Sequence, residues 1–441
     1  MKQHRILFWS FTVALGGFLF GFDTAVISGA EQAIQKVWDL NSTQHGLTIS
    51  IALIGTVIGA LFGGIPSDRI GRKKTLFWVA ALYLLSALGS ALSTDWYLFM
   101  VFRFIGGLGV GASSVTAPLY ISEIAPANRR GRLVAMFQFN VVFGIVIAYI
   151  SNYLIARAGG PNSWRWMLGI EAIPAILFLV LVLKIPRSPR WLILKRNLVD
   201  EARTVLEVIN PNNVDETIKN IEQSKHGTNK NQHLFKSRIY HLPIVLAVLI
   251  AFFNQVSGIN AIIYYAPRIF EMTGLGESTA LLSTMGIGIV NFSFTLLAMR
   301  FIDKFGRRTL MLIGSIGLII TLGLVSRAFY TESFGGVPVF LFVYIAFFAF
   351  SQGAVIWVFI SEVFPNEVRA SGQALGSFTH WFMAALIAFS FPTISEKLGG
   401  GTTFLIFAIM MVLQLVFVLR LMPETKGKSL ESIQSEIAKG K

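Results

Sequence analysis

The sequence predicts an all-α membrane protein in which two pseudo-symmetric six-helix bundles are joined in one chain. Three observations support this fold class: apolar stretches that recur along the chain, an uneven distribution of basic residues, and short motifs that repeat between the two halves. Of the 441 residues, 54% are hydrophobic and 14% are charged, whereas soluble proteins carry about 25% charged residues. This composition predicts that most of the chain lies in lipid.

Twelve apolar stretches are each long enough to cross a bilayer as a helix, which takes about 20 residues. They lie at about residues 8–28, 47–66, 75–93, 97–121, 133–156, 164–184, 243–268, 279–302, 309–330, 337–363, 371–392 and 402–422. Six precede the longest polar stretch and six follow it, which predicts twelve transmembrane helices in two sets of six.

The formal charge of +14 does not indicate nucleic-acid binding, because the basic residues follow the predicted topology. With a cytoplasmic N-terminus, the cytoplasmic loops hold 30 of the 37 Lys and Arg residues, and Arg103 lies inside a span. The opposite loops hold only Lys36, Arg157, Arg165, Arg268, Arg327 and Lys397. Cytoplasmic loops of membrane proteins carry such an excess. We therefore expect cytoplasmic termini, a lipid-bilayer location and no nucleic-acid partner.

The polar stretch at 185–242 predicts the domain organisation. We expect a first bundle at 1–184, a cytoplasmic linker with short helices at 185–242, a second bundle at 243–422 and a cytoplasmic tail at 423–441. Within the linker, apolar residues at 199–209 recur at helical spacing, which predicts an amphipathic helix. A flexible joint is expected near 224–234.

Charged motifs repeat between the halves. Residues 68–73 read DRIGRK and residues 303–308 read DKFGRR, and an acid is followed seven residues later by Arg at 123 and again at 362. Ion pairs at these cytoplasmic helix ends could close the inner side when the bundles rock against each other. The predicted gate residues are Asp68, Arg69, Arg72, Glu123, Arg130, Asp303, Arg307, Glu362 and Arg369. The alternative is that many of them only fix the topology.

Three ionisable residues lie well inside predicted spans: Asp23, Arg103 and Glu171. At about 1.5 Å per residue, all three lie roughly 8–10 Å below the outer surface, so they could form one cluster. A charge at this depth costs roughly 2.5–3.5 kcal/mol and usually has a partner or a role. We expect Asp23 to stay ionised beside Arg103 and to take a proton when Arg103 moves away. The alternative is a purely structural ion pair.

The seventh predicted span carries amides on both sides of Gly258, which favours a local break of the kind found in transporters. Amides and tryptophans suit a neutral ligand rich in hydroxyl groups, although amides also join helices and Trp also lines membrane interfaces. The predicted ligand-binding residues are Gln138, Asn254, Gln255, Asn260, Tyr264, Asn291, Trp357, His380 and Trp381.

The chain has no Cys, and its six His residues do not group within the spans. No nucleophile–base pair or cluster of metal ligands is apparent, so we expect neither an enzyme, nor a metal site, nor a cofactor.

The residues resemble those of the sugar porter family of the major facilitator superfamily over nearly the whole chain. The matching runs are residues 21–29 (GFDTAVISG), 64–73 (GIPSDRIGRK), 186–191 (PRSPRW), 255–260 with 264–265 (QVSGIN, YY) and 423–427 (PETKG). The resemblance implies a central sugar site and alternating access. Family sugar contacts correspond to Gln138, Asn254, Gln255, Asn260, Asn291 and Trp357. The pair Asp23 and Arg103 resembles that of proton-coupled bacterial xylose and glucose symporters.

The chain departs from the family pattern at several positions. Asn254 and Ile145 stand where Gln is found, Gln352 begins a run that replaces Trp-Gly-Pro, and His380 replaces an amide. Arg187 replaces the acid of a Pro-Glu-Ser-Pro-Arg run, which removes one partner from the cytoplasmic ion pairs.

We therefore expect a proton-coupled importer of a hexose or pentose that works as a monomer in a bacterial inner membrane. Alternatives with the same fold are a facilitative uniporter and a porter for a polyol such as inositol. A drug antiporter fits the amides less well. A signalling sugar receptor would need a longer cytoplasmic extension than this tail of about 19 residues.

Overall fold

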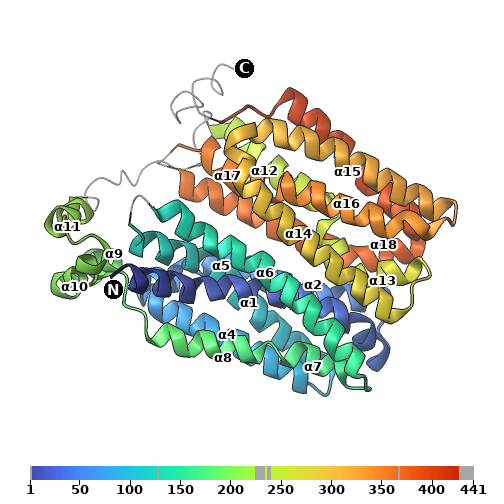
Figure 1. Cartoon of the computed structure of the whole chain (residues 1–441), viewed down its shortest axis with the longest axis horizontal. Helices are drawn as coiled ribbons and strands as arrows, with labels where there is room; N and C mark the ends of the chain where they lie inside the picture. The colour runs from blue at the N-terminus through green and yellow to red at the C-terminus, as the bar shows by residue number, and fades with distance from the viewer. Residues whose placement is uncertain (1, 127–128, 224–233, 236–239, 366–367, 427–441) are drawn as a thin grey trace. The chain divides into compact units, whose positions relative to one another are not determined.

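The computed structural model describes residues 2–126, 129–223, 234–235, 240–365 and 368–426. Every regular element in this part of the chain is a helix, as Figure 1 shows. Eleven helical stretches there are long and apolar enough to cross a membrane. Residues 224–233 of the predicted joint and residues 427–441 of the predicted tail lie outside the described part.

Contacts divide the chain into two compact units. Unit 1 holds Met1–Ile27, Ile51–Ala148 and Gly160–Lys230, and unit 2 holds Ser28–Ser50, Tyr149–Gly159 and Asn231–Lys441. Three helices pass from one unit to the other along their length: α1 (Lys2–Val37), α2 (Ser42–Phe62) and α6 (Arg130–Ala158). The last part of α1, the first part of α2 and the last part of α6 thus belong to unit 2, together with the second half of the sequence.

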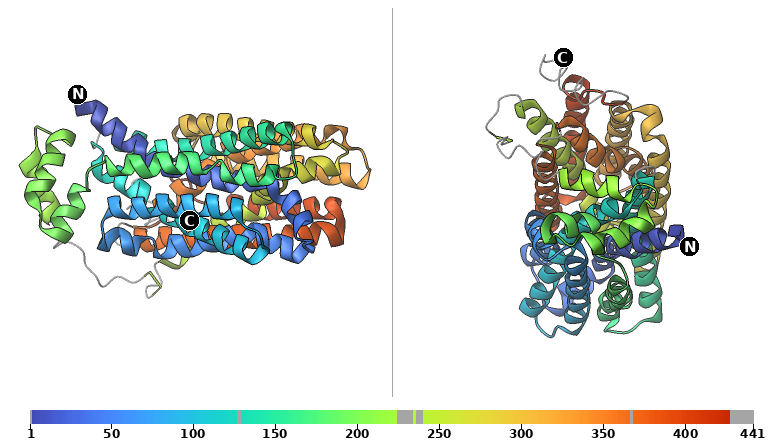
Figure 2. Two further views of the ribbon diagram at one scale, coloured as in Figure 1. Left: turned by 90° about the horizontal axis from the view of Figure 1, so that it is seen from below. Right: turned by 90° about the vertical axis from the view of Figure 1, so that its left-hand side faces the viewer.

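Unit 1 continues with long helices and ends in a group of short ones. Its further elements are α3 (Gly64–Arg69), α4 (Arg72–Leu92), α5 (Trp96–Ile124), α7 (Ser163–Gly169), α8 (Ala172–Leu183), α9 (Pro189–Trp191), the π-helix η2 (Leu192–Arg196), α10 (Val199–Ile209) and α11 (Val214–Gln223). The amphipathic helix expected at 199–209 is α10. Helices α9 to α11 lie beyond the ends of the long helices, on the side where α1 begins (Figure 1 and Figure 2).

Glycines let helix backbones touch in unit 1, as small residues do in membrane helix pairs. A Cβ on Gly21 of α1 would lie 1.8 Å from the Val141 carbonyl oxygen of α6. A Cβ on Gly107 of α5 would lie 1.9 Å from the Ala52 carbonyl oxygen of α2. No side chain larger than a hydrogen atom fits at either position without moving a helix.

Unit 2 contains helices that are interrupted inside the predicted spans. Its further elements are α12 (His241–Val256), α13 (Ile259–Met272), α14 (Glu277–Phe305), α15 (Arg307–Tyr330), the 3-10 helix η4 (Phe334–Gly336), α16 (Val337–Phe350), α17 (Gln352–Val363) and α18 (Arg369–Arg420). Gly258 adopts φ 87° between α12 and α13, a value that favours glycine. Ser351 separates α16 from α17.

The last helix is longer than one span requires. Helix α18 has 52 residues, and Gly399 within it has φ 77° and ψ 162°. At about 1.5 Å per residue such a length exceeds twice the apolar thickness of a bilayer. Counted as two spans separated at Gly399, α18 corresponds to the stretches expected at 371–392 and 402–422. Other helix ends differ from expectation. For example, α1 runs from Lys2 to Val37, beyond the predicted span at 8–28, and the polar residues at both ends belong to the helix.

Candidate functional site

Asp23, Arg103 and Glu171 lie together inside unit 1. Arg103 Nη1 donates to Asp23 Oδ1 at 2.5 Å, and Nη2 donates to the Asp23 carbonyl oxygen at 3.4 Å. Both side chains are only 3% exposed. Glu171, at the junction of α7 and α8, is buried and interacts electrostatically with both residues. The cluster that the common depth predicted is therefore present in the geometry of unit 1.

Two neighbours of this cluster were not singled out from the sequence. The hydroxyl of Tyr83 on α4 interacts electrostatically with Asp23 and Glu171, and it also interacts with Ser113 on α5. Gly106 of α5 lies against Ser86 of α4, where a Cβ would come within 2.3 Å of the Ser86 hydroxyl oxygen, and the same Cβ would lie 3.7 Å from Asp23 Oδ1. A tyrosine inside a predicted span was the available signal, but tyrosine is also an ordinary core residue in this chain.

A second polar network surrounds the break at Gly258 in unit 2. The side chain of Gln255 is its centre: Asn260 Nδ2 donates to Gln255 Oε1 at 2.6 Å, and Gln255 Nε2 donates to Asn254 Oδ1 at 2.8 Å. Gln255 Nε2 also lies 3.1 Å from His380 Nδ1. Because Nε2 has two hydrogens, it can serve Asn254 and His380 together.

Aromatic rings cover one side of this network. The His380 ring centre lies 4.9 Å from the Trp357 ring and 4.8 Å from the Trp381 ring. Amides beside indole rings can bind hydroxyl groups and the C–H face of a sugar ring. Asn254 also donates to the Gln352 carbonyl oxygen at 3.4 Å, where α17 begins. The Gln352 departure therefore lies at a break in the helix, beside this network.

The other expected ligand residues occupy separate positions. Tyr264 on α13 and Asn291 on α14 are buried in unit 2. Gln138 lies half-buried on α6 in unit 1. The structure thus joins Asn254, Gln255, Asn260, Trp357, His380 and Trp381 in one network.

The predicted gate residues form two matching ion-pair sets. In unit 1, Arg72 pairs with Asp68 at 3.0 Å and with Glu123 at 3.0 Å. Ser188, for which no role was predicted, donates to Glu123 at 2.5 Å. Arg130, another predicted gate residue, is exposed and lines a cavity of about 1020 Å³ between the bundle and α10 and α11.

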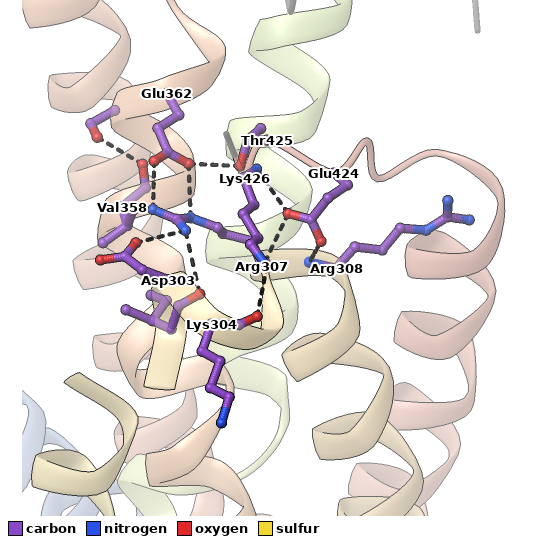
Figure 3. Close-up of polar contacts among 11 residues, drawn as sticks. Asp303, Lys304, Arg307, Arg308, Val358, Glu362, Glu424, Thr425 and Lys426 are labelled. Atoms are coloured by element: carbon purple, nitrogen blue, oxygen red, sulfur yellow. Dashed lines mark hydrogen bonds and ion pairs between the residues drawn. The ribbon is translucent and has the colours of Figure 1, made fainter. Parts of the chain in front are cut away.

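Unit 2 repeats this arrangement, as Figure 3 shows. Arg307 pairs with Asp303 at 2.9 Å and with Glu362 at 2.8 Å. Thr425 donates to the same Glu362 carboxylate at 2.6 Å. The Glu424 carboxylate accepts the backbone N–H groups of Arg307 and Arg308 at 2.9 and 3.0 Å, at the start of α15.

The remaining gate candidates do not share these ion pairs. Arg369 donates to the Phe364 carbonyl oxygen at 3.3 Å, and Arg69 is exposed. Residues 423–426 belong to the PETKG run, which carried part of the family resemblance, but no residue of this run was predicted to have a role. Its capping of α15 follows from the positive end of the helix dipole, which favours a carboxylate.

Comparison with known proteins identifies the family to which this chain belongs. The family model described as "Sugar (and other) transporter" matches residues 9–437. The chain is 36% identical to the D-xylose-proton symporter of Escherichia coli (strain K12), over 96% of this chain and 93% of the relative. It is 38% identical to the arabinose-proton symporter of Bacillus subtilis (strain 168), over 97% of this chain and 94% of the relative.

A solved structure agrees with these relatives. The inward open conformation of the xylose transporter XylE from E. coli matches with a TM-score of 0.86 and 35% identity, covering 97% of this chain and 98% of that one. The major facilitator fold expected from the sequence is therefore confirmed, as is a multi-pass membrane transporter rather than an enzyme. The protein belongs to the sugar transporter family.

Proposed function

We propose that this protein is a proton-coupled monosaccharide symporter that imports a pentose or hexose by alternating access. The observation that carries the proposal is the buried pair of Asp23 and Arg103, whose atoms lie 2.5 Å apart with both side chains 3% exposed. A buried pair of this kind is costly to build for stability alone. Relatives named as proton symporters of xylose and of arabinose support the same assignment.

Proton binding would change the charge of this cluster. With Asp23 ionised, the positive charge of Arg103 is neutralised across the short contact. A proton on Asp23 removes that partner. Glu171 could then accept from Arg103, since it already interacts with Arg103 electrostatically and one of its oxygens has no hydrogen-bond partner among the described residues. Arg103 would move toward Glu171 and shift α5 relative to α1. That movement couples the proton to the conformation.

The sugar would bind at the network around Gln255, with Asn254, Asn260 and His380 as polar contacts and Trp357 and Trp381 beside the ring. Tyr264, Asn291 and Gln138 would complete the site. The two sets around Arg72 and Arg307 would form the cytoplasmic gate together with Arg69, Arg130 and Arg369.

We further propose the location and organisation expected from the sequence. The protein would lie in a bacterial inner membrane with both termini in the cytoplasm, and it would work as a monomer. Its bundles would be residues 1–184 and 243–422, joined by the linker at 185–242 and followed by the tail at 423–441. Basic residues concentrated in alternate loops support this topology.

The test is uptake into proteoliposomes of labelled pentoses and hexoses, with and without an inward proton gradient. We expect one sugar class to accumulate above equilibrium and a protonophore to abolish the accumulation. Equilibration without accumulation would mean that the protein is a uniporter and that Asp23 and Arg103 form a structural pair. Accumulation of inositol in place of monosaccharides would identify a polyol porter.

A further inference from the structure

A cavity of about 1020 Å³ lies between the long helices of unit 1 and the short helices α10 and α11. The end of α5 and the start of α6 line one part of it, with Glu123 and Arg130. Arg72 of α4, Arg190 of α9 and residues of α10 and α11 also line it. Figure 1 shows α9, α10 and α11 together, beyond the ends of the long helices. Small-molecule sites usually measure about 300–1,000 Å³, so this cavity has room for a whole small ligand.

The charges that line the cavity are mainly positive. Among the described residues, three arginines (Arg72, Arg130 and Arg190) and one carboxylate (Glu123) line it, which leaves an excess of two positive charges. The Glu123 side chain is only 5% exposed, and its carboxylate already accepts hydrogen bonds from Arg72 at 3.0 Å and from Ser188. The excess therefore lies on Arg130 and Arg190.

The guanidinium groups of Arg130 and Arg190 make no hydrogen bond within the described part of the chain, and both residues are exposed. Arg190 attracts the Glu123 carboxylate electrostatically without bonding to it. Arg130 begins α6, where the first backbone N–H groups have no helical acceptor and the helix dipole is positive. Both cationic groups are therefore available to an anion in the cavity.

The second half of the chain uses the corresponding arginine differently. Arg369 follows Glu362 by seven residues, as Arg130 follows Glu123, but Arg369 donates to the Phe364 carbonyl oxygen at 3.3 Å. No short helices comparable with α10 and α11 follow α18 within the residues that the structure describes. The unbonded arginine thus occurs in the half that also has the cavity, which favours a ligand site over a topology signal alone.

The lining suits a phosphate ester of a small polar molecule. A phosphate monoester carries a charge of about −1.5 to −2 at pH 7, which matches the excess of two positive charges. Arginine forks bind phosphate oxygens through pairs of hydrogen bonds. On α10 and α11, the polar lining residues offer amide and hydroxyl groups that can bind sugar hydroxyls, and the apolar ones offer contacts for C–H groups. These residues are Asn210, Thr217 and Asn220, and Leu206 and Ile209.

We propose that this cavity binds a phosphorylated monosaccharide, whose phosphate is held by Arg130 and Arg190 and whose hydroxyls contact α10 and α11. The choice of sugar rests on the proposed transport function, and with the proposed topology the cavity opens to the cytoplasm. An imported monosaccharide is consumed there by phosphoryl transfer from ATP to one of its hydroxyl groups, so the product of that transfer is the expected ligand. Because Arg72 and Glu123 line the same cavity and belong to the proposed gate, a bound product would hold this gate and slow import.

The test is isothermal titration calorimetry on the full chain in phosphatidylcholine nanodiscs at pH 7.5, with glucose 6-phosphate and ribose 5-phosphate as probes. We expect one ester molecule to bind per chain, and we expect Arg130→Gln and Arg190→Gln each to raise its Kd about 10- to 100-fold, because each change removes a charge-assisted hydrogen bond to the phosphate. The matched control is Arg132→Gln, the same change at an exposed arginine of α6 that does not line the cavity. Its Kd should equal that of the unmodified protein.

Three comparisons identify the source of the phosphate. Inorganic phosphate should bind more weakly than the ester because it lacks the contacts with α10 and α11, and equal affinity would contradict a sugar ester. An excess of glucose or ribose should not displace the corresponding ester, since displacement would place the ester in the network around Gln255. Dihexanoyl phosphatidylglycerol, a soluble lipid, should not displace the ester either, and displacement would assign the cavity to a lipid headgroup instead.

Two results would overturn the site: no measurable binding of either ester, or unchanged Kd values in both Arg130→Gln and Arg190→Gln after thermal unfolding has shown that they are folded. The effect on import has its own test, because ester enclosed in proteoliposomes should slow the initial sugar uptake of the unmodified protein but not that of Arg190→Gln. Equal rates with and without the ester would refute this effect. The calorimetry does not depend on transport, so a protein that binds the ester without accumulating sugar would lose the proposed symport and keep the site.

Discussion

The substitution Asp23→Asn separates the coupling role of the buried pair from its structural role. The asparagine amide keeps an oxygen that can accept the hydrogen bond that Arg103 Nη1 donates to Asp23 Oδ1 at 2.5 Å. Unlike the carboxylate, the amide can neither bind nor release a proton. Under an inward gradient of about two pH units, a one-proton symporter accumulates sugar up to about 100-fold, since each unit is worth about 1.36 kcal/mol. We expect Asp23→Asn to reach a ratio of about 1 while still exchanging sugar.

The same change has a stability cost that a double variant should reverse. Arg103 would remain buried without a negative partner at Asp23, and an uncompensated buried charge costs about 3–5 kcal/mol. The retained amide oxygen places the expected loss at the lower end of that range. Adding Arg103→Gln removes the charge, so the double variant should regain stability in thermal unfolding but not accumulation.

The control is Asp39→Asn, the same chemical change at an exposed residue. Asp39 has φ 46°, a conformation that asparagine tolerates, so uptake should be unchanged. The assay is counterflow and gradient-driven uptake in proteoliposomes. Accumulation by Asp23→Asn at the level of the unmodified protein would refute the assignment of Asp23 as the coupling site.

Three further substitutions test the rest of the structure. Gln255→Ala should raise the sugar Kd about 10- to 100-fold, at about 1.5 kcal/mol for each lost hydrogen bond; an unchanged Kd in titration calorimetry would remove α12 from the site. Gly107→Val should prevent folding in detergent, because its side chain would meet the Ala52 carbonyl; a stable, monodisperse variant would contradict the close approach. Glu424→Gln should lower the unfolding temperature by removing the charge that caps α15, and Glu424→Asp should restore part of the loss.

Much of the fold could be predicted from sequence because its signals are local. A run of about 20 apolar residues marks a span wherever it occurs, and the repeated motifs hold Asp and Arg at the same four-residue spacing, as in the pairs of Asp68 with Arg72 and of Asp303 with Arg307. Counting along the helices also suggested that Asp23 and Arg103 could meet, and their side chains are in contact. These predictions use only residues that are close together in the sequence, or residues that lie at the same distance from a predicted helix end.

The polar networks were less predictable because they depend on which helix faces meet. Gln255 and His380 are 125 residues apart, and Glu31 and Arg268, which form an ion pair at 2.7 Å, are 237 apart. Nothing in their local patterns indicates that they touch, and Arg268 near a helix end is a residue that water alone could satisfy. The ion pair of Glu123 with Arg72 is a similar case, because the two residues are 51 apart in the sequence and the repeated motifs did not assign the pairs.

The glycine contacts have a consequence for how force travels through the protein. Between α1 and α6, and between α2 and α5, backbone lies on backbone at Gly21 and Gly107, with no layer of side chains to compress. Each pair should therefore behave as a stiff strut rather than as two helices that slide. A displacement of α1 at Asp23 would then move α6 by a similar amount. The amide hydrogens along these helix pairs should be among the slowest to exchange with solvent.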